Sequence, residues 1–276
     1  MELNTCTQEI IPVTLHDSKE FKQLIKHILK KYALLNDHYI KIITSPENML
    51  ILERAFTHPS YDDTDNYEYL EFIGDSTVNK SIVWYSQRRF PHLRNEQGVQ
   101  TFSQLKSNLV SKKSLSSLAD KLDFWKFVRM SRETQERDKR KVLEDVFESF
   151  IGGIETIVDD CINIHSGYGV CYTIISKILD KIHISLEYKD LKDSKTRLKE
   201  IFDKSKIFKD LKYVITTPRS DTNIMFGVTA VGTINSIVVK MGEEGSAPIK
   251  RQAEKNAAKI AIQWLKTNNY ISDEDE

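Results

Sequence analysis

The hydrophobic pattern of this chain changes near residue 188. Between residues 18 and 185 apolar residues recur every three or four positions, as in SKEFKQLIKHILKKYAL, and almost no segment alternates apolar with polar residues. After Tyr188 the chain contains a short amphipathic segment, three β-branched runs (YVITT, MFGVTAVG and SIVVKMG) and a final helical pattern. We therefore predict an α+β protein, in which an all-α domain precedes an α-β-β-β-α domain.

The same pattern predicts the boundaries of the domains. Residues 1–17 form an N-terminal extension, 18–185 the helical domain, 192–269 the mixed domain and 270–276 an acidic tail. A length of 276 residues is typical of two domains. An antiparallel three-stranded sheet, covered on one face by two helices, would bury the apolar residues of the mixed domain.

The overall charge is balanced, but its distribution along the chain is not. Residues 189–272 carry 16 Lys and Arg against 9 Asp and Glu, whereas residues 1–188 carry 24 against 27. The basic part is a candidate for binding a polyanion, and the acidic part is a candidate for binding a metal. A run of charge also occurs on any solvated helix face, so this asymmetry alone does not identify a function.

Nothing in the sequence predicts a membrane or secreted protein. No run of about 18 apolar residues occurs, and the N-terminus, MELNTCTQEIIPVTLHD, lacks the basic and apolar regions of a signal peptide. The three cysteines (Cys6, Cys161 and Cys171) lack the spacing of metal ligands, which is typical of free thiols in a reducing compartment. We expect a protein without a membrane partner in the cytoplasm, or in the host-cell cytoplasm if its source is viral.

Carboxylates interrupt two otherwise apolar helical segments. In YLEFIGDS, Glu71 and Asp75 are four residues apart and Glu68 precedes Glu71 by three, so all three project from one helix face. In VLEDVFESFIGGIE, Asp145 and Glu148 are three residues apart among Val, Leu, Phe and Ile. Acids are rarely buried unless they are paired or hold a metal.

We expect these two helices to pack antiparallel and to bring their acids to one point, with Gly152 and Gly153 allowing a close approach. Ligands that are all oxygen favour a hard ion, Mg²⁺ or Mn²⁺. Two alternatives remain at this point. A diiron site usually requires Glu-x-x-His motifs, which are absent here. Surface salt bridges could instead form with the nearby basic residues Lys80, Arg88, Lys139 and Lys141.

The acidic segments and their neighbours resemble the ribonuclease III family. YEYLEFIGDS looks like the family's LEFLGDS helix, and KVLEDVFESFIGGI looks like its second catalytic helix. FTHPSY and FSQLKSNLVSKKSLSSLADKL also match family segments in the family's order, over roughly residues 50 to 160. The resemblance implies a ribonuclease III nuclease domain that cleaves double-stranded RNA with Mg²⁺, for which Mn²⁺ substitutes, and leaves short duplexes with 3′ overhangs.

The resemblance also implies roles for individual residues of the helical domain. The family's catalytic, metal-binding acids match Glu71, Asp75, Asp145 and Glu148, of which Asp75 and Glu148 correspond to direct ligands. A homodimer through the nuclease domain is implied, because a duplex has two strands to cut. Glu68 matches an additional acid of the family's site, and Glu96 matches an acid that helps to join the two subunits. Phe72 matches an aromatic residue that enters the partner subunit, but it could also be a core residue.

Residues 192–269 resemble a double-stranded RNA-binding domain. IKRQAEKNAAKIA looks like that family's KKxAExxAA helix start, DSKTRLKEIF looks like its first helix, and the PRSDTN loop would reach a second minor groove. The RNA-contacting positions match Thr196, Lys199, Glu200, Lys250, Arg251 and Lys255. Two positions depart from that family's pattern: Pro248 stands where Lys is frequent and Lys199 where Gln is common.

Two other functions stay open at the level of sequence. One is a catalytically silent relative that binds double-stranded RNA or associates with ribosomes, and the complete set of acids argues against it. The other is a protein–protein adaptor built from the same folds. We predict a metal-dependent, double-strand-specific endoribonuclease.

Overall fold

The computed structural model of the protein describes residues 14–96, 98–218, 220 and 224–272. The chain divides into two compact units, Met1–Ile184 and Ser185–Glu276, each considered by itself below. The predicted extension up to residue 13, with Cys6, lies outside the described residues. So do most of the PRSDTN loop and the acidic tail from residue 273.

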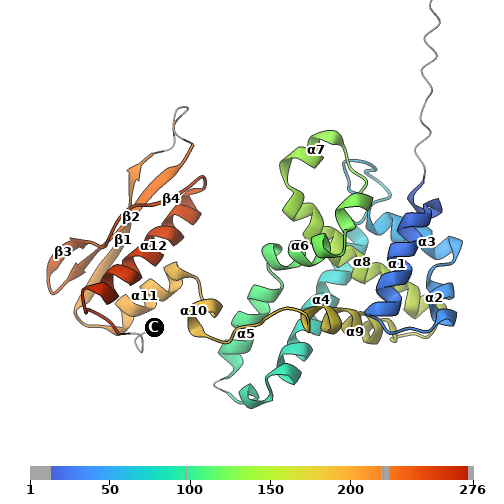
Figure 1. Ribbon diagram of the computed structural model, residues 1–276, viewed down its shortest axis with the longest axis horizontal. Helices are drawn as coiled ribbons and strands as arrows, with labels where there is room; N and C mark the ends of the chain where they lie inside the picture. The colour runs from blue at the N-terminus through green and yellow to red at the C-terminus, as the bar shows by residue number, and fades with distance from the viewer. Residues whose placement is uncertain (1–13, 97, 219, 221–223, 273–276) are drawn as a thin grey trace, which may run out of the picture. The chain divides into compact units, whose positions relative to one another are not determined.

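The first unit is helical, as predicted (Figure 1). Its α-helices are α1 (Lys19–Lys31), α2 (Asp37–Ile43), α3 (Pro46–Ala55), α4 (Glu68–Arg89), α5 (Gly98–Leu109), α6 (Lys112–Lys121), α7 (Arg132–Arg137), α8 (Lys139–Cys161) and α9 (Gly167–Leu179). Short 3₁₀ turns are η1 (Leu15–Asp17), η2 (Pro91–Leu93) and η3 (Phe124–Phe127). Several helices begin after a residue with a short polar side chain, because its oxygen accepts an otherwise unpaired N–H; Ser18 and Ser45 do so for α1 and α3.

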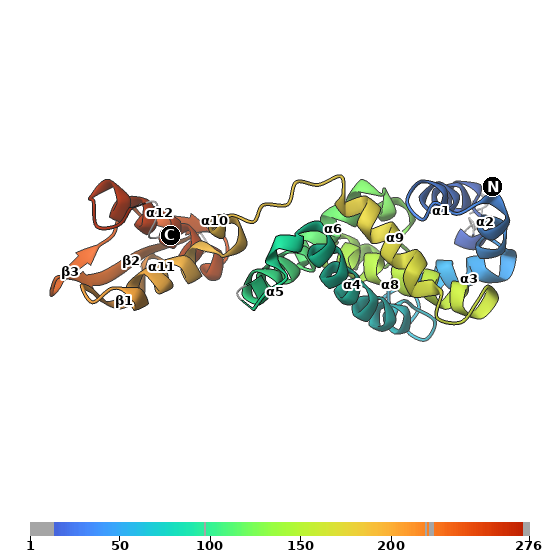
Figure 2. The same cartoon turned by 90° about the horizontal axis from the view of Figure 1, so that it is seen from below.

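Helix α8 is the centre of this unit, and α3, α4, α6 and α9 pack around it (Figure 2). Most of its residues from Val142 to Val158 are buried, Asp145 and Glu148 included, which is typical of a helix surrounded by protein. Phe147, Phe150 and Ile154 are almost completely buried, and Phe150 contacts Phe56 and Phe124 in edge-to-face geometry. Carboxylates on this helix are consequently held in an apolar surrounding.

No helix within the described ranges is both long and apolar enough to cross a membrane.

The second unit contains a small antiparallel sheet and two main helices. Its elements are α10 (Tyr188–Leu191), α11 (Ser194–Lys204), β1 (Phe208–Thr217), β2 (Phe226–Ile234), β3 (Ile237–Lys240), β4 (Gly245–Ala247) and α12 (Lys250–Thr267). β2 pairs with β1 on one side, and on the other with β3 and β4 in succession. The third predicted run, SIVVKMG, forms β3, and β4 is a further short strand that was not predicted. The sequence did not reveal β4 because three residues, GSA, are too few to show a period.

The two helices α11 and α12 cover the same face of the sheet, as predicted (Figure 1). Leu198 and Phe202 from α11 and Ala258 and Ala261 from α12 share a buried core with Ala230 of β2. The alanines allow α12 to lie close to the sheet. At Gly245 a methyl group would overlap the backbone of Ala257, so β4 and α12 are in contact at their backbones.

Candidate active site

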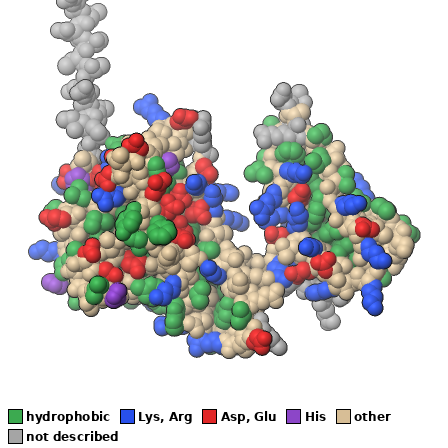
Figure 3. Space-filling model, turned by 180° about the vertical axis from the view of Figure 1, so that it is seen from behind, with side chains coloured by type: hydrophobic (Ala, Val, Ile, Leu, Met, Phe, Trp, Pro, Cys, Tyr) green, Lys and Arg blue, Asp and Glu red, His purple; other side chains and the backbone are tan. Residues whose placement is uncertain are grey.

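Carboxylates from α4 and α8 meet in one pocket of the helical unit. One oxygen of each of Glu71, Asp145 and Glu148 lies within 4.8 Å of the others. On the face shown in Figure 3, acidic side chains gather on this unit, with hydrophobic side chains beside them. The pocket, of about 560 Å³, is lined by Glu68, Glu71, Phe72, Asp75, Val110, Glu144, Asp145 and Glu148.

Two glycines allow α4 and α8 to approach closely enough for this convergence. A methyl group at Gly74 would overlap the carbonyl oxygen of Glu148, and one at Gly152 would overlap the carbonyl oxygen of Leu70. The role expected for Gly152 is confirmed. Gly153 is different, because a methyl there would lie 3.6 Å from the nearest side chain, an ordinary contact. The glycine facing Gly152 across the helix pair is Gly74, inside the YLEFIGDS motif.

The prediction that these helices run antiparallel is wrong. Later residues of one helix contact later residues of the other. Tyr67, just before α4, is hydrogen-bonded to Asp145, and Thr77, farther along α4, is hydrogen-bonded to Glu155. The helices therefore run in the same general direction. A parallel arrangement needs a long connection, and the chain from Phe90 to Asp138, which contains α5, α6 and α7, provides it.

Tyr67, which the sequence did not single out, holds one of the acids in place. Its hydroxyl donates a hydrogen bond of 3.0 Å to Asp145 Oδ2. Burial first, and then the charge of Asp145, raise the pKa of the Tyr67 phenol, so this hydroxyl keeps its proton. The His58 ring meets the Tyr67 ring edge to face at 5.6 Å, and burial lowers the pKa of His58. We assign this histidine a structural role.

The carboxylates of the pocket repel one another and are poorly solvated. Burial first, then Asp75 and other neighbouring acids, raise the pKa of Glu148 to about 8. Burial and the charge of Asp145 raise the pKa of Glu71 to about 7. Burial also raises the pKa of Asp145, although the Tyr67 hydrogen bond opposes this. A cation among these oxygens would reverse the unfavourable interaction.

The surface salt-bridge alternative is wrong for this cluster. Within the described part of the chain, none of the four predicted metal-binding acids forms an ion pair with a basic side chain. Lys80 lies over the Tyr168 ring and Arg88 over the Trp84 ring, while Lys139 pairs with Asp120 at 2.7 Å. Lys141 lowers the pKa of Glu71 and Asp145 but forms no ion pair with them within the described residues. A largely buried, all-oxygen donor set without an ion-paired basic side chain fits a hard divalent cation.

Two of the predicted acids lie at the rim of the cluster. Asp75 lines the pocket and is exposed, and its Oδ1 accepts a hydrogen bond of 2.7 Å from the Asn79 amide. Glu68 also lines the pocket and is exposed. Glu144 is an additional acid, and burial raises its pKa. It lies four residues before Glu148 on α8, so the same i, i+4 spacing could have found it, but only Asp145 and Glu148 were singled out in that segment.

The two predicted dimer-contact residues lie in different surroundings. Phe72 lines the acidic pocket with 74% of its surface exposed, which excludes the interpretation that it is a core residue of this unit. Glu96 is exposed in the turn before α5 and does not line the acidic pocket. Their contacts with a second subunit stay predictions.

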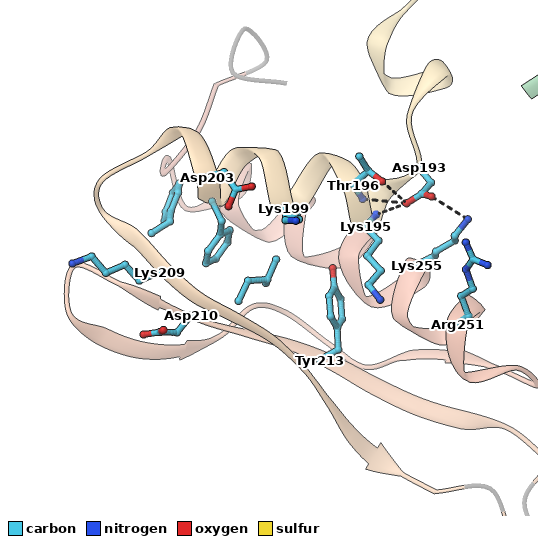
Figure 4. A pocket seen from close by; sticks show the side chains of 13 residues that line it. Asp193, Lys195, Thr196, Lys199, Asp203, Lys209, Asp210, Tyr213, Arg251 and Lys255 are labelled. Atoms are coloured by element: carbon cyan, nitrogen blue, oxygen red, sulfur yellow. Dashed lines mark hydrogen bonds and ion pairs between the residues drawn. The ribbon is translucent and has the colours of Figure 1, made fainter. Parts of the chain in front are cut away.

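The second unit carries a cationic pocket between α11, β1 and the start of α12 (Figure 4). Its volume is about 640 Å³. Four of the predicted RNA-contacting residues line it: Thr196, Lys199, Arg251 and Lys255. Lys195, Lys209 and Tyr213 also line it and were missed: Lys195 lies within DSKTRLKEIF but was not matched to a contact position, and Lys209 and Tyr213 lie on β1, outside the motifs compared. The Tyr213 hydroxyl is buried and has no hydrogen-bond partner among the residues that the structure describes.

Asp193 organises the end of this pocket nearest α12. Its Oδ1 accepts hydrogen bonds from the backbone N–H groups of Lys195 and Thr196, which begins α11, and its Oδ2 pairs with Lys255 at 3.2 Å. Lys195 pairs with Glu254 at 2.7 Å. Predicted residues outside the pocket are Lys250, the first residue of α12, and Glu200, which pairs with Lys192.

Together these features define a class of protein: a helical domain with a cluster of converging carboxylates, joined to a small domain of mixed helices and strands with a pocket rich in lysine and arginine. Residues 48–182 match the family model described as Ribonuclease-III-like. The chain is 36% identical over 267 residues to a putative ribonuclease 3 of Invertebrate iridescent virus 6, covering 92% of this chain and 89% of that one. The chain belongs to the ribonuclease III family.

Two further comparisons show how far the similarity extends. A putative ribonuclease 3 of Frog virus 3 is 36% identical over 246 residues, which cover 88% of this chain and 62% of that protein. A crystal structure of the nuclease domain of ribonuclease III from Campylobacter jejuni matches with a TM-score of 0.41 and 23% identity, covering 57% of this chain and 97% of that domain.

Proposed function

We propose that this protein is an endoribonuclease that hydrolyses double-stranded RNA with a divalent cation, Mg²⁺ or Mn²⁺. The observation that carries the proposal is the cluster of Glu71, Asp145 and Glu148 within 4.8 Å, in a member of the ribonuclease III family. These carboxylates would hold the ion, with Asp75 completing the site from the rim of the pocket.

The residues around the cluster have supporting roles. Bound Mg²⁺ supplies the positive charge that activates water for attack on the phosphodiester and that stabilises the leaving oxygen. The Tyr67 hydroxyl orients Asp145, and the Asn79 amide orients Asp75. Phe72 and Val110 line the pocket beside the acids and are its apolar residues.

The cationic pocket of the second unit supports the choice of substrate. Lys199, Arg251 and Lys255 line one pocket, and Lys250 begins α12, where the helix dipole also favours phosphate. We infer that this unit is a double-stranded RNA-binding domain and that Thr196 and Glu200 on α11 contact the minor groove. Contacts of this kind select duplexes by shape rather than by sequence.

The proposal includes a homodimer. One acidic pocket per chain can cut one strand, so two copies are needed to cut both strands of a duplex. Phe72 lies exposed beside the acids, where it could enter a partner subunit. The expected products are short duplexes with 3′ overhangs.

The test is cleavage of a long RNA duplex by the full chain with Mg²⁺, with EDTA, and with single-stranded RNA of the same sequence. We expect cutting of the duplex alone, and only with Mg²⁺. Glu148→Gln should retain duplex binding and abolish cutting, whereas Glu47→Gln, an exposed acid on α3, should cut normally. Duplex binding without cutting by the wild-type chain would contradict the proposal and indicate a catalytically silent relative.

A further inference from the structure

Four lysines line a second pocket of the helical unit, separate from the acids. Lys22, Lys26 and Lys30 of α1 and Lys41 of α2 surround a pocket of about 640 Å³. No residue that lines it also lines the acidic pocket. Residues 18–46, which contain it, carry six Lys and only two acids, whereas residues 1–188 as a whole are slightly acidic.

Packing of α1 fixes the direction in which these lysines point. Phe21, Ile25, Ile28 and Leu29 on its other face are completely buried. Lys22, Lys26 and Lys30 are therefore held in a row, one helical turn apart, along about 12 Å of the helix. Lys41 adds a positive charge from α2, so the row is one wall of a pocket.

The charges of this pocket are not neutralised within the described part of the chain. Lys30 pairs with Asp37 at 3.4 Å, but both side chains are largely exposed, so this pair contributes little. Lys22, Lys26 and Lys41 form no ion pair with any described residue. Like charges four residues apart on a helix repel each other, and a polyanion in the pocket would remove that repulsion.

We propose that this lysine pocket binds the phosphate backbone of the RNA substrate, as a contact of the nuclease unit beyond its acidic pocket. The inference rests on the proposed function. A strand of duplex DNA carries one phosphate per about 3.4 Å of axis, and the rise of an A-form RNA duplex is somewhat shorter, so the lysine row spans about four phosphates of an RNA strand. An RNA partner is favoured over a protein or a membrane, because the apolar lining residues are only Ile40, which is buried, and Pro46. Protein interfaces and membrane-bound helices usually add exposed apolar anchors.

The experiment measures binding of a fluorescent RNA duplex to the full chain in EDTA, at several salt concentrations. Lys22→Gln, Lys26→Gln and Lys41→Gln are combined in one variant. The matched control combines Lys31→Gln, Lys121→Gln and Lys177→Gln, three lysines outside the pocket. Both lose three charges, so only the location differs. A double variant, Lys26→Gln with Lys41→Gln, changes two fully exposed side chains and provides a smaller perturbation of the fold.

The pocket variant should bind about tenfold more weakly or worse, and the slope of log affinity against log salt should fall by about two to three relative to wild type. The double variant should show a smaller change in the same direction, and the control should stay near wild type. Equal effects of the pocket variant and the control would overturn the inference. The same variants are also tested for binding to anionic vesicles. If the pocket variant loses vesicle binding but keeps its RNA binding, the inference is likewise overturned. Cleavage of the duplex by wild type with Mg²⁺ tests the proposed function separately.

Discussion

The Tyr67 hydroxyl donates a 3.0 Å hydrogen bond to Asp145 Oδ2 and so joins the start of α4 to the acidic stretch of α8. Without this bond, the buried Asp145 carboxylate would lose the hydrogen-bond donor that the Tyr67 side chain provides. The bond lowers the pKa of Asp145 against the effect of burial, which keeps this carboxylate available for a cation.

Replacing Tyr67 with Phe should destabilise the fold and weaken the cation site together. Loss of one buried hydrogen bond to a charged group costs about 1.5–3 kcal/mol, measured by urea unfolding. Mg²⁺ affinity near neutral pH should also fall, measured by calorimetry, because the pKa of Asp145 rises. Tyr69→Phe is the control, because Tyr69 on the same helix is 67% exposed. Unchanged Mg²⁺ affinity in the Tyr67 variant would remove this residue from the site.

Gly74→Ala should separate α4 from α8. Its methyl group would overlap the Glu148 carbonyl oxygen, which is a backbone atom that cannot turn away. We expect a loss of about 3 kcal/mol or more in the free energy of unfolding, typical of severe overpacking. Gly153→Ala, one residue beyond the other contact glycine, should be within about 1 kcal/mol of wild type or more stable, since Ala favours helix. If Gly74→Ala and Gly153→Ala had similar free energies of unfolding, the close approach of α4 and α8 at Gly74 would be contradicted.

The acidic pocket predicts an unusual dependence of stability on pH. The pKa of Glu148 is raised to about 8 and that of Glu71 to about 7, above the ordinary value of 4.5. Between pH 4.5 and about pH 8, these carboxyl groups hold protons in the folded protein that they have already released in the unfolded chain. The contribution of these groups is therefore fully present at acidic pH and is lost as pH rises toward 8.

This dependence is measured by urea unfolding in EDTA across that range. Glu148→Gln should flatten the decline and raise the stability at pH 8, because a neutral amide does not repel the neighbouring acids. Mg²⁺ should stabilise wild type at pH 8 more than at pH 6, since protons compete with the cation for the same oxygens. A variant that declines as steeply as wild type would show that Glu148 does not titrate in this window.

Removing cations at the start of α12 should weaken RNA binding without regard to sequence. Lys250→Ala with Arg251→Ala should lower the salt slope of duplex binding by about two, one unit per lost phosphate contact. Lys212→Ala with Lys240→Ala, two exposed lysines of the sheet, should leave it unchanged. A wild-type slope in the first variant would exclude those residues from the phosphate contacts.

Phe72→Ala should dissociate the proposed dimer. A buried aromatic anchor in an interface contributes about 2 kcal/mol or more, roughly a 30-fold change in the dimer dissociation constant, which sedimentation velocity measures. The monomer's stability should change by less than about 0.5 kcal/mol, because Phe72 is 74% exposed. Leu50→Ala, another exposed apolar residue, is the control. A dimer of unchanged strength would exclude Phe72 from the interface.

Local periodicity predicted the order of the main elements, although not β4, and it placed acids on one face of each of two helices. The 3.6-residue and two-residue patterns depend only on neighbours in the chain, so they separated the helical unit from the mixed one. The i, i+3 and i, i+4 spacing placed Glu71 and Glu148 each among acids on one helix face, and the structure brings these two together with Asp145.

The tertiary structure decided how those faces meet. Nothing in the local pattern distinguishes a parallel from an antiparallel helix pair, because direction depends on how the long chain between α4 and α8 returns. The importance of Gly74 and Tyr67 likewise depends on atoms about seventy residues away, the Glu148 carbonyl and the Asp145 carboxylate. Spacing along the chain is a short-range property, whereas close packing and buried hydrogen bonds are set by partners that only the folded chain brings together.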